Sequence, residues 1–209
     1  MVINFKNPWH ISIIACFLPL FFLIIDILLG NLGANPIQTL HIRLGDWSLR
    51  FLCVTLAITP IQVITKWRGM ADYRQLFGVC CFGYSLIHVL VYLAVDNALN
   101  WSIIAVDMIE SPYIWLGIFS FLIITVLAIT SPNYAKKKLG KNWKKLHRLI
   151  YFSAVFAVIH YLWQLKGNLV QPIFYGILIF LLLLFRVLNY LKNKKLNKLM
   201  IPNRSISEQ

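Results

Sequence analysis

The stretch LFGVCCFGYSLIHVLVYLAV, residues 76–95, decides the fold class, because it contains 20 residues without one Asp, Glu, Lys or Arg. A helix of 20 residues is about 30 Å long, which matches the hydrocarbon thickness of a membrane. The stretch therefore predicts a transmembrane helix, and a single histidine, His88, lies inside it.

Five further apolar stretches surround this one in the chain, at about residues 11–29, 47–65, 113–130, 149–165 and 173–190. The composition agrees with a membrane protein: 59% of the residues are hydrophobic and 13% are charged, against about 45–50% and 25% in soluble domains. Such a composition argues against both an ordinary soluble domain and a disordered chain. We expect residues 1–209 to form one domain, an all-α membrane protein built as a bundle of six transmembrane helices.

The distribution of positive charge predicts the orientation of this bundle. The chain carries 20 Lys and Arg but only 7 Asp and Glu. Most of the positive residues fall in the links before the third and fifth spans and after the sixth, and such links stay in the cytoplasm. Both termini are therefore expected inside, with residues 191–209 as a short basic cytoplasmic tail. The net positive charge is explained by basic links on one side of a membrane, and no nucleic-acid partner is expected.

Residues 98–111 are apolar but interrupted by polar side chains. We expect them to form a short helix on the outer face of the membrane, anchored by Trp101. With Asp107 and Glu110, this link is the expected docking surface for a partner protein. Asp26, near the end of the first span, and Arg50, near the start of the second, are expected to meet near the outer face, as an ion pair or as part of a site.

Two histidines are predicted at the same depth in the membrane. His88 lies 12 residues beyond the start of the third span and His160 lies 11 beyond the start of the fifth, which is about 16–18 Å along each helix. Both spans cross in the same direction. Two neutral imidazoles facing each other across a bundle are typical axial ligands of a haem iron. The residues alone leave a second interpretation open, in which each histidine is a core residue bonded to a backbone carbonyl.

A third histidine, His147, lies 13 residues before His160, about 20 Å nearer the inner face. At that level it could ligate a second haem, although 13 residues turn its side chain about 140° away from His160 on a regular helix. The third span has Gln75 and Arg74 at the matching level and no histidine. Arg74 is expected to bind a haem propionate or to anchor the inner face, and His147 can also be read as part of a cationic interface segment.

The sequence contains no P-loop, GxGxxG, HExxH or nucleophile motif. Nothing in it indicates hydrolysis or nucleotide binding, and no catalytic residue is expected.

The stretch KKLGKNWKKLHRLIYFSAVFAVIHYLW, residues 137–163, resembles the haem-binding membrane subunits of bacterial periplasmic methionine sulfoxide reductase systems. Its LGxxWxxLHxxxY pattern followed by IHYLW is the specific part. Four other segments are similar to the same family: GANPIQTLHIRLGDW (33–47), LAITP (56–60), RQLFGVCCFGYSLIHVLVYL (74–93) and SPYIWLGIFSF (111–121). This family belongs with the ferric-reductase-like transmembrane domains.

The resemblance implies a six-helix bundle that carries one or two b-type haems between histidines of the third and fifth spans. His88 matches the third-span ligand, and His147 and His160 match the two fifth-span histidines. FMN is a further cofactor associated with the family, and no FMN motif can be read here. The implied role is electron transfer in the bacterial inner (cytoplasmic) membrane, from quinol to a periplasmic molybdenum-cofactor catalytic subunit that repairs methionine sulfoxide in oxidised proteins.

Two other functions stay open at this point. One is a stand-alone haem membrane enzyme that reduces ferric iron or oxygen, and the other is a non-redox transporter or structural bundle. Whether the chain is an enzyme in its own right is also open, because the implied subunit delivers electrons and does not bind the sulfoxide.

Overall fold

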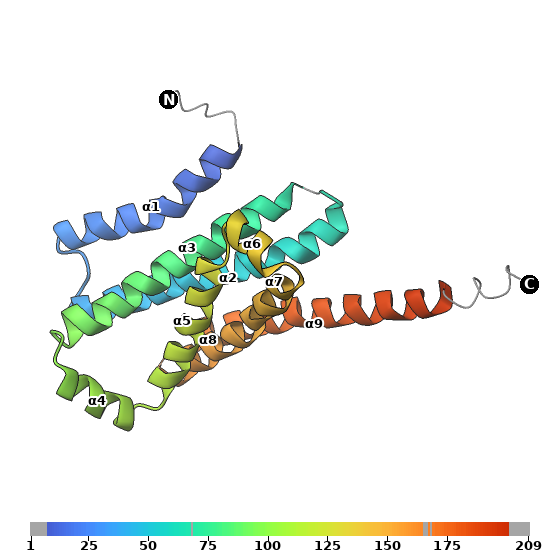
Figure 1. Ribbon diagram of the computed structural model, residues 1–209. Coiled ribbons are helices and arrows are strands. Elements are labelled where there is room, and N and C mark those ends of the chain that lie inside the picture. The colour runs from blue at the N-terminus through green and yellow to red at the C-terminus, as the bar shows by residue number, and fades with distance from the viewer. Residues whose placement is uncertain (1–7, 68, 165–166, 168, 201–209) are drawn as a thin grey trace, which may run out of the picture.

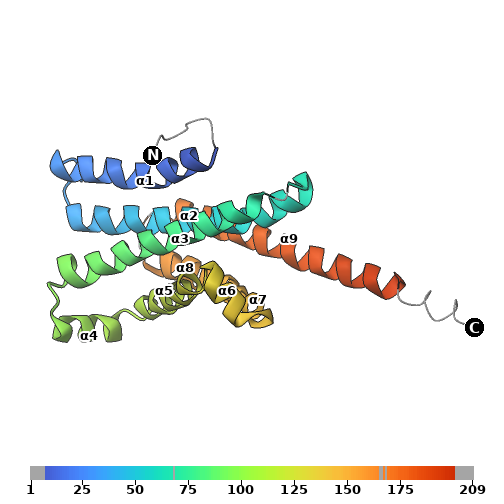
Figure 2. The same ribbon diagram turned by 45° about the horizontal axis from the view of Figure 1, so that its top comes forward.

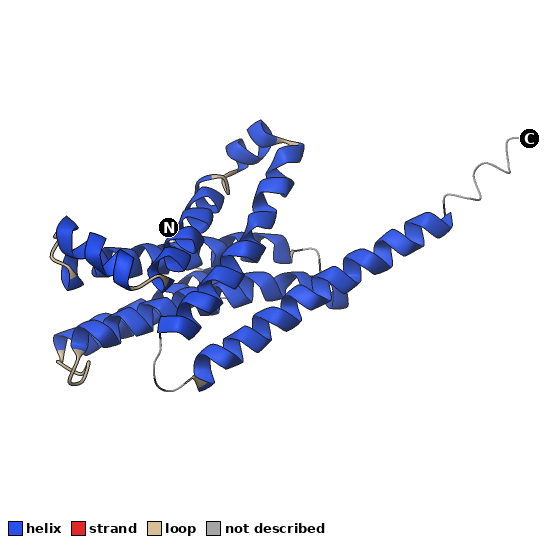
Figure 3. Cartoon of the chain, turned by 90° about the horizontal axis from the view of Figure 1, so that it is seen from below, coloured by secondary structure: helices blue, strands red, loops and turns tan. Residues whose placement is uncertain are grey.

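The computed structural model describes residues 8–67, 69–164, 167 and 169–200, and within these ranges the chain is helical without a strand (Figures 1 and 3). The elements are α1 (Pro8–Leu28), α2 (Pro36–Thr65), α3 (Met70–Leu90), η1 (Val91–Asp96), α4 (Trp101–Glu110), α5 (Tyr113–Ile129), α6 (Asn133–Leu139), α7 (Lys141–Leu146), η2 (His147–Leu149), α8 (Ile150–Gln164) and α9 (Val170–Met200). Of the expected tail, residues 191–200 continue α9, and 201–209 lie outside the described residues.

Five helical segments of the described chain are long and apolar enough to cross a membrane: Trp9–Leu28, Pro36–Thr65, Met70–Asp96, Lys141–Gln164 and Val170–Leu196. A sixth candidate combines α4 with α5, whose axes differ by 110°. α5 alone has 17 residues, or about 25 Å of helix. The predicted all-α, multi-pass membrane fold is confirmed.

The second span begins 11 residues earlier than its hydropathy predicts. Asn35 caps α2 by accepting a hydrogen bond from the Gln38 backbone N–H at 3.2 Å, and Pro36 occupies the first turn, where its missing N–H is harmless. The first turns are polar, but their side chains find partners inside the protein. Arg43 pairs with Asp26 of α1, and His41 lies 3.5 Å from Asp96. The expected ion pair between Asp26 and Arg50 is therefore wrong.

Two pairs of helices form the centre of the bundle. α2 packs along α3, and α5 packs along α8. α3 also contacts α5, while α9 lies against α2 and α8 (Figures 1 and 2). The C-terminal part of α9 extends beyond the other helices in all views (Figures 1, 2 and 3).

α1 is bent near its middle (Figure 1), where Pro19 lies inside the helix. The Tyr84 hydroxyl of α3 donates to the Cys16 carbonyl at 2.9 Å and accepts from the Leu20 N–H at 3.0 Å. A regular helix joins those two backbone groups directly, so the hydroxyl is inserted in the hydrogen-bond ladder. Tyr84 thereby joins the bend of α1 to the bundle.

The expected helix within residues 98–111 is present as α4. Asn100 caps it, with its side-chain oxygen accepting from the N–H groups of Ser102 and Ile103. Trp101, the expected anchor, is 68% exposed. Before α4, the chain leaves α3 through the π-helical turn η1, which turns Tyr92 and Asp96 toward the interior space described next.

Candidate functional site

A cavity of about 720 Å³ lies between α2, α3, α5 and α8. Its volume falls in the range of about 300–1,000 Å³ that is typical of cofactor and small-molecule sites. Polar side chains, including Asn35, Asp96 and Asp107, line one end, and Leu52 and Ile124 line the other. His88 and His160 both line this cavity, from α3 and α8 respectively.

Each of the two histidines is held by a backbone carbonyl on a neighbouring helix. His88 Nδ1 lies 3.1 Å from the carbonyl oxygen of His41, and His160 Nδ1 lies 2.8 Å from that of Tyr113. A carbonyl oxygen only accepts hydrogen bonds, so each Nδ1 carries the proton. The Nε2 lone pair of both rings is thereby left for a ligand, which is the tautomer that a metal-binding histidine adopts when its other nitrogen donates to a carbonyl.

A glycine faces each of these rings. A Cβ atom at Gly117 would lie 2.9 Å from His160 Cε1, and one at Gly45 would lie 3.5 Å from His88 Cε1. A side chain at position 117 would therefore displace the His160 ring, whereas position 45 leaves ordinary contact distance. Two oriented imidazoles on one cavity of this size suit a haem with two axial histidines.

His147 and Arg74 are not among the residues that line this cavity. The Thr130 hydroxyl donates to the Val126 carbonyl at 2.7 Å and lies 3.2 Å from His147 Nε2. Its one hydrogen is thus used, so His147 Nε2 carries a proton and donates to Thr130. The His147 ring also packs on Trp143, with 4.0 Å between ring centroids. In this arrangement His147 joins the start of α8 to the end of α5.

Arg74 is half-buried on α3, 14 residues before His88, or about 21 Å away along the helix. Nearby on the same helix, Gln75 accepts a hydrogen bond from Lys136 at 2.7 Å. The structure therefore brings His88 and His160 to one cavity and places His147 and Arg74 at the other end of the bundle.

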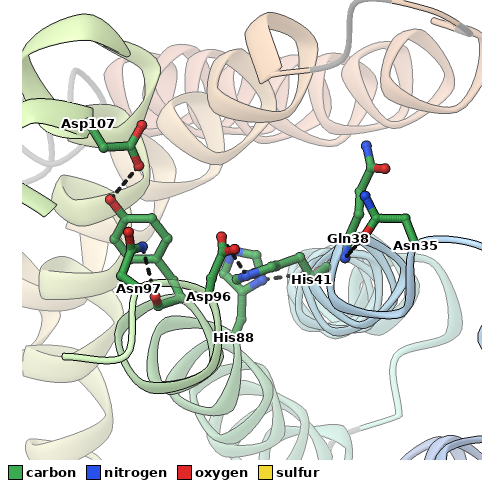
Figure 4. A network of polar contacts seen from close by, with 8 residues as sticks. Asn35, Gln38, His41, His88, Asp96, Asn97 and Asp107 are labelled. Carbon is green, nitrogen blue, oxygen red and sulfur yellow. Dashed lines mark hydrogen bonds and ion pairs between the residues drawn. The ribbon is translucent and has the colours of Figure 1, made fainter. Parts of the chain in front are cut away.

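Five cavity residues were not predicted from the sequence, mainly because the N-terminal turns of α2 and residues 96 and 107 were expected in links. The His41 ring lies edge-on to His88, with 5.3 Å between centroids, and its Nε2 is 3.5 Å from Asp96 Oδ2. The Tyr92 hydroxyl donates to Asp107 Oδ2 at 2.7 Å. Figure 4 shows these groups converging from α2, the end of α3 and α4. The fifth missed residue, Asp46, is buried and also lines the cavity.

A usable sequence signal was present for the part of the cavity that α2 lines. Asn35-Pro36 is a typical start of a helix. A helix read from that point places Gln38, His41, Gly45, Leu49 and Leu52 on one face at intervals of three or four residues, and all five line the cavity.

Residues 44–158 match the family model described as "Ferric reductase like transmembrane component". A curated relative from Brucella anthropi, "Protein-methionine-sulfoxide reductase heme-binding subunit MsrQ", is 38% identical over 169 residues, covering 79% of this chain and 76% of the relative. The protein of the same name from Brucella ovis is 37% identical over 167 residues, with the same coverage of both chains.

The chain belongs to the MsrQ family. Within the ferric-reductase-like match lie α3 with His88, all of α5 and the first part of α8, and the match ends two residues before His160. The MsrQ relatives carry haem binding and methionine sulfoxide reductase in their names. No solved structure matches the chain.

Proposed function

We propose that this chain is the haem b-binding membrane subunit of a protein-methionine-sulfoxide reductase system. In this role it takes electrons from quinol in the bacterial inner membrane and delivers them to a periplasmic molybdenum-cofactor catalytic subunit. The observation that carries the proposal is the pair His88 and His160, which line one cavity with both Nε2 atoms free. The names of the MsrQ relatives support the same role.

The residues of this chain would hold and tune the haem. His88 and His160 would be the axial ligands, and the carbonyls of His41 and Tyr113 fix the ring orientations and raise the basicity of the ligands. Apolar side chains such as Leu52 and Ile124 keep one end of the cavity dry, and burial of this kind influences the reduction potential. When bound, haem supplies a one-electron carrier inside the membrane, which no amino-acid side chain of this site provides.

The geometry favours one haem over two. For His147 to ligate a second iron through Nε2, it would have to give up its bond to Thr130. Of the two third-span side chains expected at the matching level, Gln75 accepts a hydrogen bond from Lys136, and Arg74 is a cation and a poor iron ligand. We therefore keep His147 and Arg74 as residues of the inner end and assign no residue to FMN.

We place the docking surface for the catalytic subunit on α4, with both termini of the chain in the cytoplasm. Glu110 is exposed on α4, and a shallow hollow beside it is lined by Asn97, Ser102, Ile103, Val106 and Asp107. Since Asp107 is bonded to Tyr92, Glu110 is the carboxylate that is free to contact a partner.

The test is reconstitution of electron transfer. Purified protein in lipid vesicles, given quinol and a catalytic subunit from an MsrQ-containing system, is expected to drive reduction of a methionine-sulfoxide protein. His88→Ala and His160→Ala should abolish this activity, while His147→Ala should retain it. A wild-type protein that reduces ferric iron or oxygen without the catalytic subunit, and does not support sulfoxide reduction, would overturn the proposal.

A further inference from the structure

A buried carboxylate lines the same cavity as His88 and His160. Asp46 of α2 is 8% exposed and lines the cavity. It directly follows Gly45, the glycine that faces His88, and its carboxylate lies next to Tyr161, which follows His160 in the chain. An acidic side chain inside a membrane protein is costly and marks a functional site by default.

The partners that Asp46 has in the protein leave one of its oxygens open. Asp46 Oδ2 lies 3.8 Å from Arg50 Nη2, which is too long for a hydrogen bond. Arg50 donates its Nε–H to the Tyr175 hydroxyl at 2.9 Å, and the Tyr161 hydroxyl donates to Gln171 at 3.2 Å. Among the residues that the structure describes, Asp46 Oδ1 has no hydrogen-bond partner.

The other two carboxylates that line the cavity, Asp96 and Asp107, have neighbouring side chains as partners, and Asp26 lies outside the cavity. Asp26 pairs with Arg43 away from the cavity, Asp96 lies beside His41, and Asp107 accepts from Tyr92. Because a buried acceptor without a partner costs about 1–3 kcal/mol or more, a hydrogen-bond donor from a ligand in the cavity would stabilise Asp46. A porphyrin bound to iron has no N–H donor, and its propionates are acceptors when ionised, so the donor we consider is a hydroxyl of a second molecule.

The chemistry of the site narrows the class of that molecule. It must reach an intramembrane cavity, carry a hydroxyl donor and lie close to the redox centre. A hydroquinone meets all three conditions, and it must also lose two protons whenever it gives up its two electrons. A donor that passes electrons alone would have no use for a proton acceptor here.

We propose that Asp46 binds a hydroxyl of the hydroquinone electron donor in this cavity and accepts its proton. Each hydroquinone becomes a quinone by breaking two O–H bonds and losing two electrons. A haem held by His88 and His160 would take these electrons one at a time, passing the first to the catalytic subunit before it accepts the second. The first proton goes to Asp46, which releases it to water at the polar end of the cavity before it accepts the second. Arg50 of α2 and Tyr161 of α8 lie beside the carboxylate, and the Tyr175 hydroxyl of α9 accepts a hydrogen bond from Arg50. This inference rests on the proposed function.

The experiment compares two reductants on the haem-loaded protein. Reduction of the haem by decylubiquinol is followed by stopped-flow absorbance. Reduction by dithionite, which needs no proton acceptor in the protein, is the comparison. Because general-base catalysis contributes about 10²–10⁴-fold, Asp46→Asn is expected to slow quinol reduction by about 100-fold or more. Haem content and dithionite reduction should stay unchanged. Asp46→Glu should recover most of the rate, and the matched control Asp26→Asn should behave as wild type.

The outcomes distinguish a failure of the proposed role of Asp46 from a failure of the proposed function, in which quinol is the electron donor. An Asp46→Asn protein that quinol reduces at the wild-type rate would overturn the role of Asp46. A wild-type protein that dithionite reduces but quinol does not would instead overturn quinol as the donor. If Asp46→Asn fails to load haem, infrared difference spectra of the wild type and Asp46→Glu decide. Time-resolved spectra during quinol reduction should show a transient protonated-carboxyl band that shifts in Asp46→Glu, and the absence of such a band contradicts the proposal.

Discussion

Single atoms determine the orientation and the tautomer of the two cavity histidines. The carbonyls of His41 and Tyr113 direct both Nδ1–H groups away from the cavity, and the missing side chain of Gly117 leaves room for the His160 ring. The depth of His88 and His160 could be predicted by counting residues along each span. The carbonyl partners could not, because they depend on how neighbouring helices are placed.

Gly117→Ala tests this residue-level account. The new Cβ would lie 2.9 Å from His160 Cε1, so the ring must move and its bond to Tyr113 must weaken. Since disturbing the support of a metal ligand costs about 10–100-fold in affinity, the purified variant should retain haem about 10-fold or more less tightly. Gly83→Ala is the matched control, because a Cβ there meets nothing within 4 Å. Equal haem retention by both variants would show that the contact at Gly117 is unimportant.

Helix boundaries account for most of the difference between expectation and structure. Counting apolar residues located the hydrophobic part of each span, but the start of α2 was missed because residues 36–46 include Gln38, His41, Arg43 and Asp46. These side chains are compatible with a membrane helix only because they meet partners or the cavity. His147 is the first residue of the 3₁₀ turn η2, which precedes the regular helix α8. The direction of the His147 side chain therefore could not be predicted from regular helical spacing.

The bend of α1 gives a prediction at the scale of elements. Tyr84→Phe removes the hydroxyl that joins the Cys16 carbonyl and the Leu20 N–H. We expect the free energy of unfolding in mixed micelles to fall by about 0.5–2 kcal/mol. In a Pro19→Ala background the loss should be smaller, because a straighter α1 can close its own hydrogen bond. An identical loss in both backgrounds would mean that the hydroxyl does not compensate for the bend.

The hydrogen bond between Thr130, at the end of α5, and His147, just before α8, gives a second prediction at the scale of elements. Thr130→Val and His147→Ala each remove one side of the same hydrogen bond. Each is expected to cost about 1 kcal/mol of unfolding free energy, and the double variant should cost less than the sum of the two. Haem content should stay at the wild-type level in all three proteins. A strict sum of the single effects, or a loss of haem in Thr130→Val, would argue against the assigned role of His147.

The whole molecule combines an apolar outer surface with a polar-ended interior cavity. Side chains such as Phe17 and Phe180 are more than 60% exposed on α1 and α9, as lipid-facing residues are. The basic links, with α6 and α7, and the exposed lysines of α9 fall at the end opposite α4 (Figure 1), which supports an orientation with both termini in the cytoplasm.

Single cysteines in a background without Cys16, Cys53, Cys80 and Cys81 test this orientation. A cysteine at exposed Ser102 of α4 should react with a membrane-impermeant maleimide added to spheroplasts. A cysteine at Lys194 of α9 should react only after the membrane is opened. The reverse pattern of labelling would place the termini outside.

The central claim is that His88 and His160 together hold one b-type haem. It is tested most directly by haem stoichiometry, measured by the pyridine haemochrome assay on detergent-purified wild type and on His88→Ala, His160→Ala and His147→Ala. We predict one haem per chain in the wild type and in His147→Ala, with a sharp reduced b-type spectrum, and loss of haem in the other two variants. Full haem content in His88→Ala and His160→Ala, or a wild type without haem, would contradict the account.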